Sequence, residues 1–319
     1  MDLNINTLNI ELTTNCNCKC FACTRILMGV SPNNIDSESL IKFLDEESLK
    51  NIEQLRIVGN SGDPIFHPEF KKIIDHVITN RLPTKARLHI STNGSIHNGT
   101  WWEDLAKALS KDDEVVFTLD GLEDTHKRHR QTDFKTVLRN MSAFINAGGS
   151  AIWQYIMFDY NEHQVEEAYE LARSIGVSDF LVMSTNYCDS EHGFPSEKAI
   201  KKYANLFKPR YGQDDKEFKQ VTWRHRCTLG AGFLYINSYG YVTPCCFITG
   251  YNKIPTIKQA ESVWFYHELI KNYQDLHIME KTFMSIRNHP FYKYVIKNVK
   301  KIKICQHLCD SKTFNDYDL

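Results

Sequence analysis

Three cysteines lie close together near the N-terminus, at Cys16, Cys20 and Cys23, in the spacing Cys-x3-Cys-x2-Cys. A [4Fe–4S] cube takes one thiolate per iron, so a compact loop can bind three irons and leave the fourth open. An open metal position can bind and activate a ligand. The alternative is a zinc knuckle, but zinc usually takes four ligands in two pairs, and no histidine lies nearby. We interpret Cys18 as a bystander, with ligation through Cys18 as the other possibility.

Ten cysteines in 319 residues favour metal chemistry over disulfides, because no export signal precedes them and the cytosol keeps thiols reduced. The N-terminus lacks a basic and apolar signal pattern, and no apolar run is long enough to span a membrane. A net charge of −1 gives no electrostatic footprint for nucleic acid or anionic lipid. We therefore expect a cytoplasmic protein that binds neither nucleic acid nor membrane.

Strand and helix patterns alternate over the first 186 residues. The expected strands are 8–12, 52–59, 87–91, 114–119, 152–158 and 179–183, and the expected helices are 37–51, 67–79, 101–109, 134–147 and 162–175. This alternation predicts parallel strands joined by right-handed crossovers. Six units are too few to close an eight-fold barrel, so we predict an α/β fold, a partial (β/α)6 TIM-like barrel, whose site lies at the carboxyl ends of its strands.

The segment ELTTNCNCKCFACTR, with its three cysteines after the first strand, resembles the radical S-adenosylmethionine (SAM) superfamily, and most closely its members with a SPASM/Twitch extension. The resemblance covers nearly the whole chain. It implies that the methionine amine and carboxylate of SAM chelate the open iron. It further implies reductive cleavage of SAM to a 5′-deoxyadenosyl radical, which abstracts a substrate hydrogen. An external one-electron reductant of the flavodoxin or ferredoxin type would supply the electron.

Further motifs match that family at successive strand ends. Ser61-Gly62-Asp63-Pro64 resembles the GGEP motif that holds the methionine amine, with Ser for the first Gly and Asp for Glu. The resemblance assigns Ser91 and Asn93 to the ribose and methionine carboxylate. Each motif is also ordinary turn chemistry when taken alone.

Three more residues are assigned by the same resemblance. Asp120, in Leu119-Asp120-Gly121, would lie near the substrate, or else cap the next helix. Gln154 matches a cofactor contact, and Met183 would pack against adenine or belong to the core. The position before Cys23, where relatives often have a bulky residue against adenine, is Ala22, with Phe21 preceding it.

A second cluster site is expected in the C-terminal third. Cys227, Gly240 and Cys245 match the C-x9–15-G-x4-C signature of the SPASM/Twitch extension, and Cys305 and Cys309 could complete four ligands. A full SPASM domain uses seven cysteines, so one auxiliary [4Fe–4S] cluster of the Twitch type is expected, giving two clusters in all. The segment 232–247 predicts a hairpin that folds over the barrel mouth.

These expectations define three regions: a radical SAM barrel at 1–186, a linker at 187–222 and the auxiliary domain at 223–319. We expect an oxidoreductase or epimerase that dehydrogenates or epimerises a small molecule. The alternatives are a maturase that cross-links or epimerises a peptide, and a non-enzymatic metal-binding regulatory module. Epimerisation needs a hydrogen-donating thiol, for which Cys246 is the candidate and Cys188 the second choice; an inert Cys246 is the structural alternative.

Overall fold

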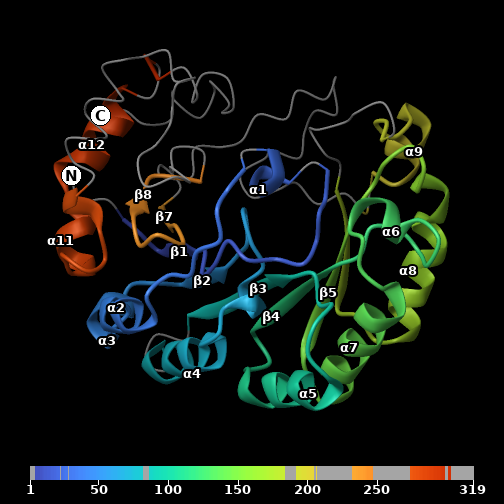
Figure 1. Cartoon of the computed structure of the whole chain (residues 1–319), viewed down its shortest axis with the longest axis horizontal. Coiled ribbons are helices and arrows are strands. Elements are labelled where there is room, and N and C mark those ends of the chain that lie inside the picture. Colours follow the sequence, from blue (N-terminus) through green and yellow to red (C-terminus); the bar gives the residue numbers. More distant parts are fainter. Residues whose placement is uncertain are drawn as a thin grey trace.

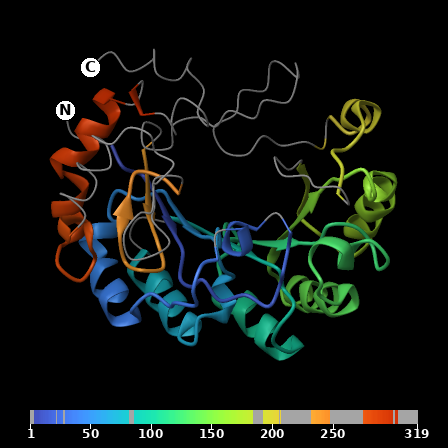
Figure 2. The same cartoon turned by 45° about the horizontal axis from the view of Figure 1, so that its top comes forward.

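The computed structural model describes residues 4–21, 23–27, 29–81, 86–183, 192–204, 206, 232–246, 274–298 and 301–302. These residues form one eight-stranded sheet in the order β6-β5-β4-β3-β2-β1-β7-β8. The sheet is strongly curved, and most of the helices lie along its outer side (Figures 1 and 2). Within the described residues no helix is long and apolar enough to cross a membrane.

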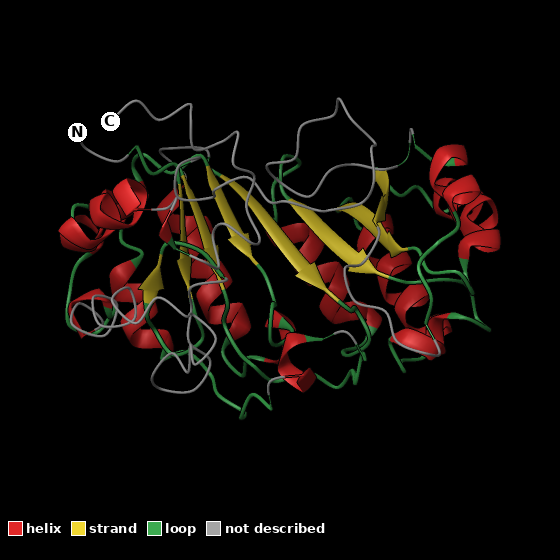
Figure 3. Cartoon of the chain, turned by 90° about the horizontal axis from the view of Figure 1, so that it is seen from above, coloured by secondary structure: helices red, strands yellow, loops and turns green. Residues whose placement is uncertain are grey.

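Six parallel strands form the barrel portion of this sheet, as the sequence predicts. They are β1 (Thr7–Ile10), β2 (Gln54–Ile57), β3 (Arg87–Thr92), β4 (Glu114–Thr118), β5 (Ser150–Ile156) and β6 (Asp179–Met183), each hydrogen-bonded to the next. Seen from above, the strands run side by side (Figure 3), so their carboxyl ends gather at one edge. The expected partial TIM-like barrel is confirmed.

Amphipathic helices connect the strands and bury their apolar stripes against one face of the sheet. They are α2 (Ser37–Phe43), α3 (Glu46–Leu49), α4 (Phe70–Arg81), α5 (Gly99–Ala108), α7 (Phe134–Asn146) and α8 (Val165–Ser174). Side-chain caps fix several starts: Asp36 accepts from the Ser39 amide, Asn98 from Trp101 and Asp133 from Thr136. The expected single helix over 37–51 is therefore two, because Asp45 caps a new start at Glu46.

Short elements complete the described chain. They are α1 (Thr24–Leu27), α6 (His126–His129), α9 (Glu197–Lys202), α11 (Phe283–Arg287), α12 (Pro290–Asn298) and the 3-10 turns at 64–66, 162–164 and 274–276. Of these, α1 and α6 follow strand ends and border the site described below. The residue pattern over 262–273 also predicts a helix, and that segment lies outside the described residues.

The C-terminal hairpin differs in position from the expectation. It forms as β7 (Phe233–Ile236) and β8 (Val242–Thr243), which pair antiparallel. However, β7 also pairs in parallel with β1, from Thr7 opposite Phe233 to Ile10 opposite Ile236. The prediction that the hairpin folds over the barrel mouth is therefore wrong: it extends the sheet beyond β1, because the free edge of β1 offers backbone partners that side-chain patterns do not reveal.

Candidate functional site at the carboxyl ends of the strands

The cysteine loop begins directly after β1. Cys16 and Cys23 are half-buried, Cys18 and Cys20 are buried, and all four are free thiols. The amide of Cys23 donates to the Cys20 carbonyl at 3.1 Å, and the amides of Ile26 and Leu27 donate to Cys23, which leads the chain into α1. The loop therefore brings the three predicted ligands together within one compact turn.

The loop after β2 packs directly on this cysteine loop. A Cβ added to Gly62 would lie 2.0 Å from the Thr13 carbonyl oxygen, so only glycine permits this approach. The Asp63 amide donates to the Asn15 carbonyl at 2.8 Å. The Ser61-Gly62-Asp63 motif is thus held against the residues that precede Cys16, and its binding of the methionine amine stays a prediction.

The thiols lie in an electropositive, proton-sharing environment. Hydrogen bonding from the Cys18 thiol lowers the pKa of Cys16. The same donor, followed by the charges of Arg130 and His129, lowers the pKa of Cys20. The Cys18 thiol has one proton, so it can donate to either Cys16 or Cys20 at a time. These hydrogen bonds raise the pKa of Cys18 itself. Ready loss of protons by Cys16 and Cys20 suits thiols that must bind iron as thiolates, whereas burial raises the pKa of Cys23.

The chemistry of the donor set fits a cluster, because three cysteines can supply one thiolate to each of three irons. Within the described part of the chain, no three histidine, cysteine or acidic side chains converge as the ligands of one metal ion do. A cube takes each thiolate on a different iron, so its ligands need not converge. The loop after β2 lies beside this donor set, where the buried Ser61 side chain faces the Glu11 carboxyl.

Asp63 joins the strand ends through its carboxylate. It accepts from the Thr92 hydroxyl at 2.9 Å, the Asn93 amide at 2.6 Å and the Ile65 amide at 3.3 Å. Burial raises its pKa to about 6 despite these bonds. Because its oxygens are occupied within the protein, Asp63 fixes the loops after β2 and β3 relative to each other. The predicted contact of Asp63 with the cofactor amine stays a prediction.

The two residues predicted on β3 differ in their partners. The Ser91 hydroxyl lies 3.3 Å from His89 Nε2 and is half-buried. The Asn93 carboxamide is buried and turned toward the cysteine loop, where Nδ2 lies 3.4 Å from Cys16 Sγ and 3.1 Å from Asn17 Oδ1. Asn93 therefore belongs to the surroundings of the cysteine loop itself.

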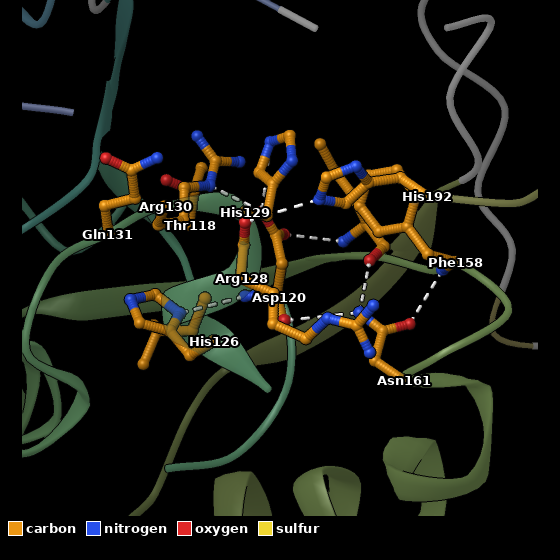
Figure 4. A network of polar contacts seen from close by, with 12 residues as sticks. Thr118, Asp120, His126, Arg128, His129, Arg130, Gln131, Phe158, Asn161 and His192 are labelled. Carbon is orange, nitrogen blue, oxygen red and sulfur yellow. Dashed lines mark hydrogen bonds and ion pairs between the residues drawn. The ribbon is translucent and has the colours of Figure 1, made fainter. Parts of the chain in front are cut away.

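Asp120, at the end of β4, holds an arginine in place (Figure 4). Its carboxylate accepts from Arg130 Nε and from the Ile156 amide at 2.8 Å, and His129 Nε2 lies 3.7 Å away. Burial would raise the pKa of Asp120, but Arg130 and His129 outweigh it and hold that pKa below its usual value. Asp120 is completely buried, so the structure gives it a positioning role; direct contact with a substrate stays a prediction.

Arg130 is a functional candidate that sequence reasoning missed. Only its Nε is bonded to Asp120, and no described residue accepts from its two terminal amino groups. Burial would lower the pKa of Arg130, but the charge of Asp120 raises it overall, so the side chain stays cationic. Its charge acts on both Cys20 and Asp63, which places it between the cysteine loop and the loop after β2.

Several aromatic rings pack against one another beside Cys20. Phe21 stacks on His192 with ring centroids 3.8 Å apart, and it meets His129 edge-on at 5.2 Å. Phe158 contacts both Phe21 and His129. Such rings exclude water from the loop and offer a flat face for a base.

Gln154 lies within β5, two residues before its end, and Met183 is the last residue of β6. The Gln154 side chain is half-buried, and no hydrogen bond to it is found among the described residues. Met183 is buried, and its carbonyl accepts from the Met157 amide at 2.7 Å. The polar atoms of the Gln154 side chain are therefore not engaged by any described residue.

Only part of the expected auxiliary site is described. Cys245 and Cys246 follow β8 and are half-buried, and the Thr243 hydroxyl donates to the Cys245 carbonyl at 3.2 Å. Cys245 also packs against the hydrophobic core. The other predicted ligands, Cys227, Cys305 and Cys309, lie outside the described residues, as do Cys188 and Ala22.

A family profile described as the radical SAM superfamily matches residues 10–172, just over half of the chain. This chain belongs to the radical SAM superfamily. Membership implies SAM and one [4Fe–4S] cluster as cofactors. The chain is thus a radical SAM enzyme, and the resemblance inferred from its cysteine loop is confirmed.

Two curated relatives extend the comparison. The chain is 23% identical over 254 residues to the sporulation killing factor maturation protein SkfB of Bacillus subtilis, an alignment covering 74% of this chain and 59% of SkfB. It is 21% identical to a GTP 3′,8-cyclase of Clostridium botulinum, over 92% of this chain and 93% of the cyclase. The chain spans less than two thirds of SkfB.

Solved structures share the fold at low identity. SuiB of Streptococcus suis bound to S-adenosylmethionine matches with a TM-score of 0.67 and 15% identity, over 97% of this chain and 77% of SuiB. The enzyme anSMEcpe, solved with AdoMet and a peptide, matches with a TM-score of 0.62 and 15% identity. The match covers 95% of this chain and 88% of anSMEcpe. These neighbours are SPASM/Twitch-type radical SAM enzymes, which supports the fold assigned above.

Proposed function

We propose that this enzyme reductively cleaves SAM with a cluster on Cys16, Cys20 and Cys23 and uses the resulting radical to take a hydrogen atom from a peptide. The observation that carries the cleavage step is the convergence of three elements at one sheet edge. These are the cysteine loop, the Ser61–Asp63 loop packed on it through Gly62, and the Asp120-held Arg130.

The bound cofactors would supply a reducing electron and a cleavable sulfonium, and the protein would hold the reacting groups. Arg130 would bind the methionine carboxylate, because its terminal amino groups are available donors beside the cysteine loop. Ser61 and the backbone around Gly62 would bind the amine. Gln154 would donate to the ribose, and the ring face of Phe21 would meet the adenine.

A second [4Fe–4S] cluster on Cys227, Cys245, Cys305 and Cys309 is part of the proposal. Four thiolates would saturate its irons, which favours electron transfer over direct substrate binding. In a dehydrogenation, the substrate radical would give one electron to this cluster and a proton to a base. In an epimerisation, Cys246 or Cys188 would return a hydrogen atom from its thiol.

The peptide assignment draws on the relatives. SkfB is named as a maturation protein, SuiB has been solved with the precursor peptide SuiA, and anSMEcpe with a peptide. The small-molecule expectation from the sequence is the second candidate, and the GTP 3′,8-cyclase, which aligns over nearly its whole length, favours it.

The decisive experiment is anaerobic SAM cleavage by the reconstituted enzyme. We expect 5′-deoxyadenosine and methionine after reduction, and no product from variants with Cys16, Cys20 or Cys23 replaced by alanine. Cys18→Ala is the matched control and should retain cleavage. Cleavage that survives in all three ligand variants would refute the assignment.

The substrate class is tested by isotope transfer. A peptide encoded beside the gene, deuterated at its α-carbons or β-carbons, should pass deuterium into 5′-deoxyadenosine. Transfer from a deuterated nucleotide or sugar instead would favour the small-molecule candidate. Deuterium can reach 5′-deoxyadenosine only through SAM cleavage, so this experiment is carried out on enzyme that has already shown cleavage.

A further inference from the structure

The Asn93 carboxamide uses all of its hydrogen-bonding capacity inside the protein. Its Nδ2 donates to Cys16 Sγ at 3.4 Å and to Asn17 Oδ1 at 3.1 Å. Its Oδ1 accepts from the Ser95 amide at 2.9 Å and the Ser95 hydroxyl at 2.6 Å. An amide offers two donors and two acceptor lone pairs, so none is left for a ribose or a carboxylate.

The Ser95 amide fixes which end of the carboxamide faces the cysteine. A backbone N–H can only donate, so the atom of Asn93 that it meets at 2.9 Å must be the oxygen. The nitrogen is then the atom beside Cys16. A flipped carboxamide would place two donors together at Ser95 and an oxygen against a thiolate.

The carboxamide is also held rigidly. The Asn93 amide donates to Asp63 Oδ2 at 2.6 Å, and the Gly94 amide to the Thr92 hydroxyl at 3.0 Å. The side chain is 4% exposed, so water competes little for these bonds. The donor to Cys16 is therefore preorganised by Asp63 in the loop after β2 and by Thr92 at the end of β3, outside the cysteine loop.

We propose that Asn93 is a positioning residue that sets the reduction potential of the SAM-cleaving cluster, by donating a hydrogen bond from its carboxamide to the Cys16 thiolate. This proposal rests on the proposed function, because it needs a cluster on Cys16. It replaces the cofactor contact expected for Asn93 from the sequence.

The physical reason is charge. Reduction adds an electron to the cluster and its thiolates, and a donor aimed at a ligand sulfur stabilises the reduced state. Removing the Asn93 donor should therefore lower the reduction potential. A protein without the bond should need a stronger reductant, while its cluster and SAM site stay intact.

The test is a potentiometric EPR titration of the reconstituted enzyme and two variants. Asn93→Leu removes the donor at similar size, and Asn93→Asp also adds a negative charge. We expect the ratio of reduced to oxidised cluster at a fixed potential to fall about tenfold in Asn93→Leu, roughly 59 mV for a one-electron couple. The fall should be larger in Asn93→Asp.

The matched control is Asn140→Leu. Asn140 is fully buried, and its Nδ2 donates to the carbonyls of Gly94 and Ile96 in the same loop, without contacting a cysteine. Its cluster potential should equal that of the unaltered enzyme. An equal shift in Asn140→Leu and Asn93→Leu would overturn the proposal, because loop damage would then explain both.

A measurement on the unaltered enzyme covers the case in which both Asn93 variants lose the cluster. ENDOR of the reduced cluster should show a proton coupling that disappears in D2O. It should also show a ¹⁵N coupling when asparagine is labelled at its side-chain amide. Absence of that nitrogen coupling would overturn the proposal. Failure to form any cluster would instead refute the proposed function, so the two failures are distinguishable.

Discussion

At the residue scale, the pair of Asp120 and Arg130 shows how a buried carboxylate can fix the position of a buried cation. Two charges leave water at considerable cost, which their attraction offsets only when the geometry is good. Asp120 meets that condition by accepting from Arg130 Nε and the Ile156 amide together. Arg130 is thereby fixed beside the cysteine loop with its terminal amino groups available for an anion.

We predict that Arg130→Gln weakens SAM binding. Hydrogen bonds to charged groups contribute roughly 1.5–3 kcal/mol, so the dissociation constant should rise about ten- to a hundredfold. The measurement is the SAM-dependent change in the EPR spectrum of the reduced cluster. The control is Arg128→Gln on the same short helix, where the guanidinium lies over the Tyr160 ring at 4.0 Å, and its affinity should stay unchanged. Equal affinity in Arg130→Gln would remove Arg130 from the SAM site.

The contrast between Cys16 and Arg130 shows which site residues a sequence reveals. The cysteines share one loop, and their spacing alone indicates a cluster. Arg130 comes ten residues after Asp120 and is brought back by the turn that α6 makes, with the His126 ring accepting from the Asp120 amide at 3.3 Å. Nothing in the local pattern HKRHR distinguishes Arg130 from the exposed cations Lys127 and Arg128.

At the element scale, the contact between two loops depends on one glycine. The loop after β2 approaches the Thr13 carbonyl so closely that Gly62 cannot carry a side chain. The Asp63–Asn15 hydrogen bond lies in the same contact. The strand ends are thus joined to each other by backbone packing before any cofactor binds.

We predict that Gly62→Ala destabilises the protein by roughly 1–3 kcal/mol, the usual cost of overpacking, and weakens SAM binding. Gly99→Ala is the control, because a Cβ there would meet only the Ala143 side chain at 3.7 Å, an ordinary contact. Thermal unfolding of both variants against the parent checks this. A Gly62→Ala protein as stable as Gly99→Ala would mean that the two loops are not packed as described.

The elements of the barrel were predictable, and the placement of the C-terminal hairpin was not. Alternating patterns located β1 to β6 because each strand buries one face under amphipathic helices. The same patterns also predicted the β7–β8 hairpin. They could not predict that β7 joins β1, since that pairing is made by backbone groups across more than 220 residues of sequence.

At the scale of the whole molecule, Glu11 lies where three parts of the chain meet. It follows β1, accepts from the Ser61 amide at 2.5 Å in the loop after β2, and accepts from the Tyr235 hydroxyl at 3.0 Å on β7. Tyr235 in turn accepts from Asn60 Nδ2 at 3.0 Å. One buried carboxyl group therefore connects the expected amine site to the C-terminal hairpin that carries Cys245.

This position makes stability depend on pH. Burial raises the pKa of Glu11 from 4.5 to about 7. Between these values the folded protein keeps a proton that the unfolded chain has lost, so the free energy of unfolding falls as pH rises. The contribution of Glu11 is fully present below pH 4.5 and lost above about pH 7, and it amounts to roughly 3 kcal/mol.

We predict that Glu11→Gln removes this part of the pH dependence. Glutamine can still accept from the Ser61 amide and donate to the Tyr235 hydroxyl, yet it carries no proton to lose. The unfolding midpoint measured from pH 5 to pH 8 should therefore fall less steeply in Glu11→Gln than in the parent. Glu197→Gln, at a side chain 92% exposed, should keep the parental slope. Parallel curves for Glu11→Gln and the parent would show that Glu11 stays ionised on folding, and that burial between barrel and hairpin does not control its proton.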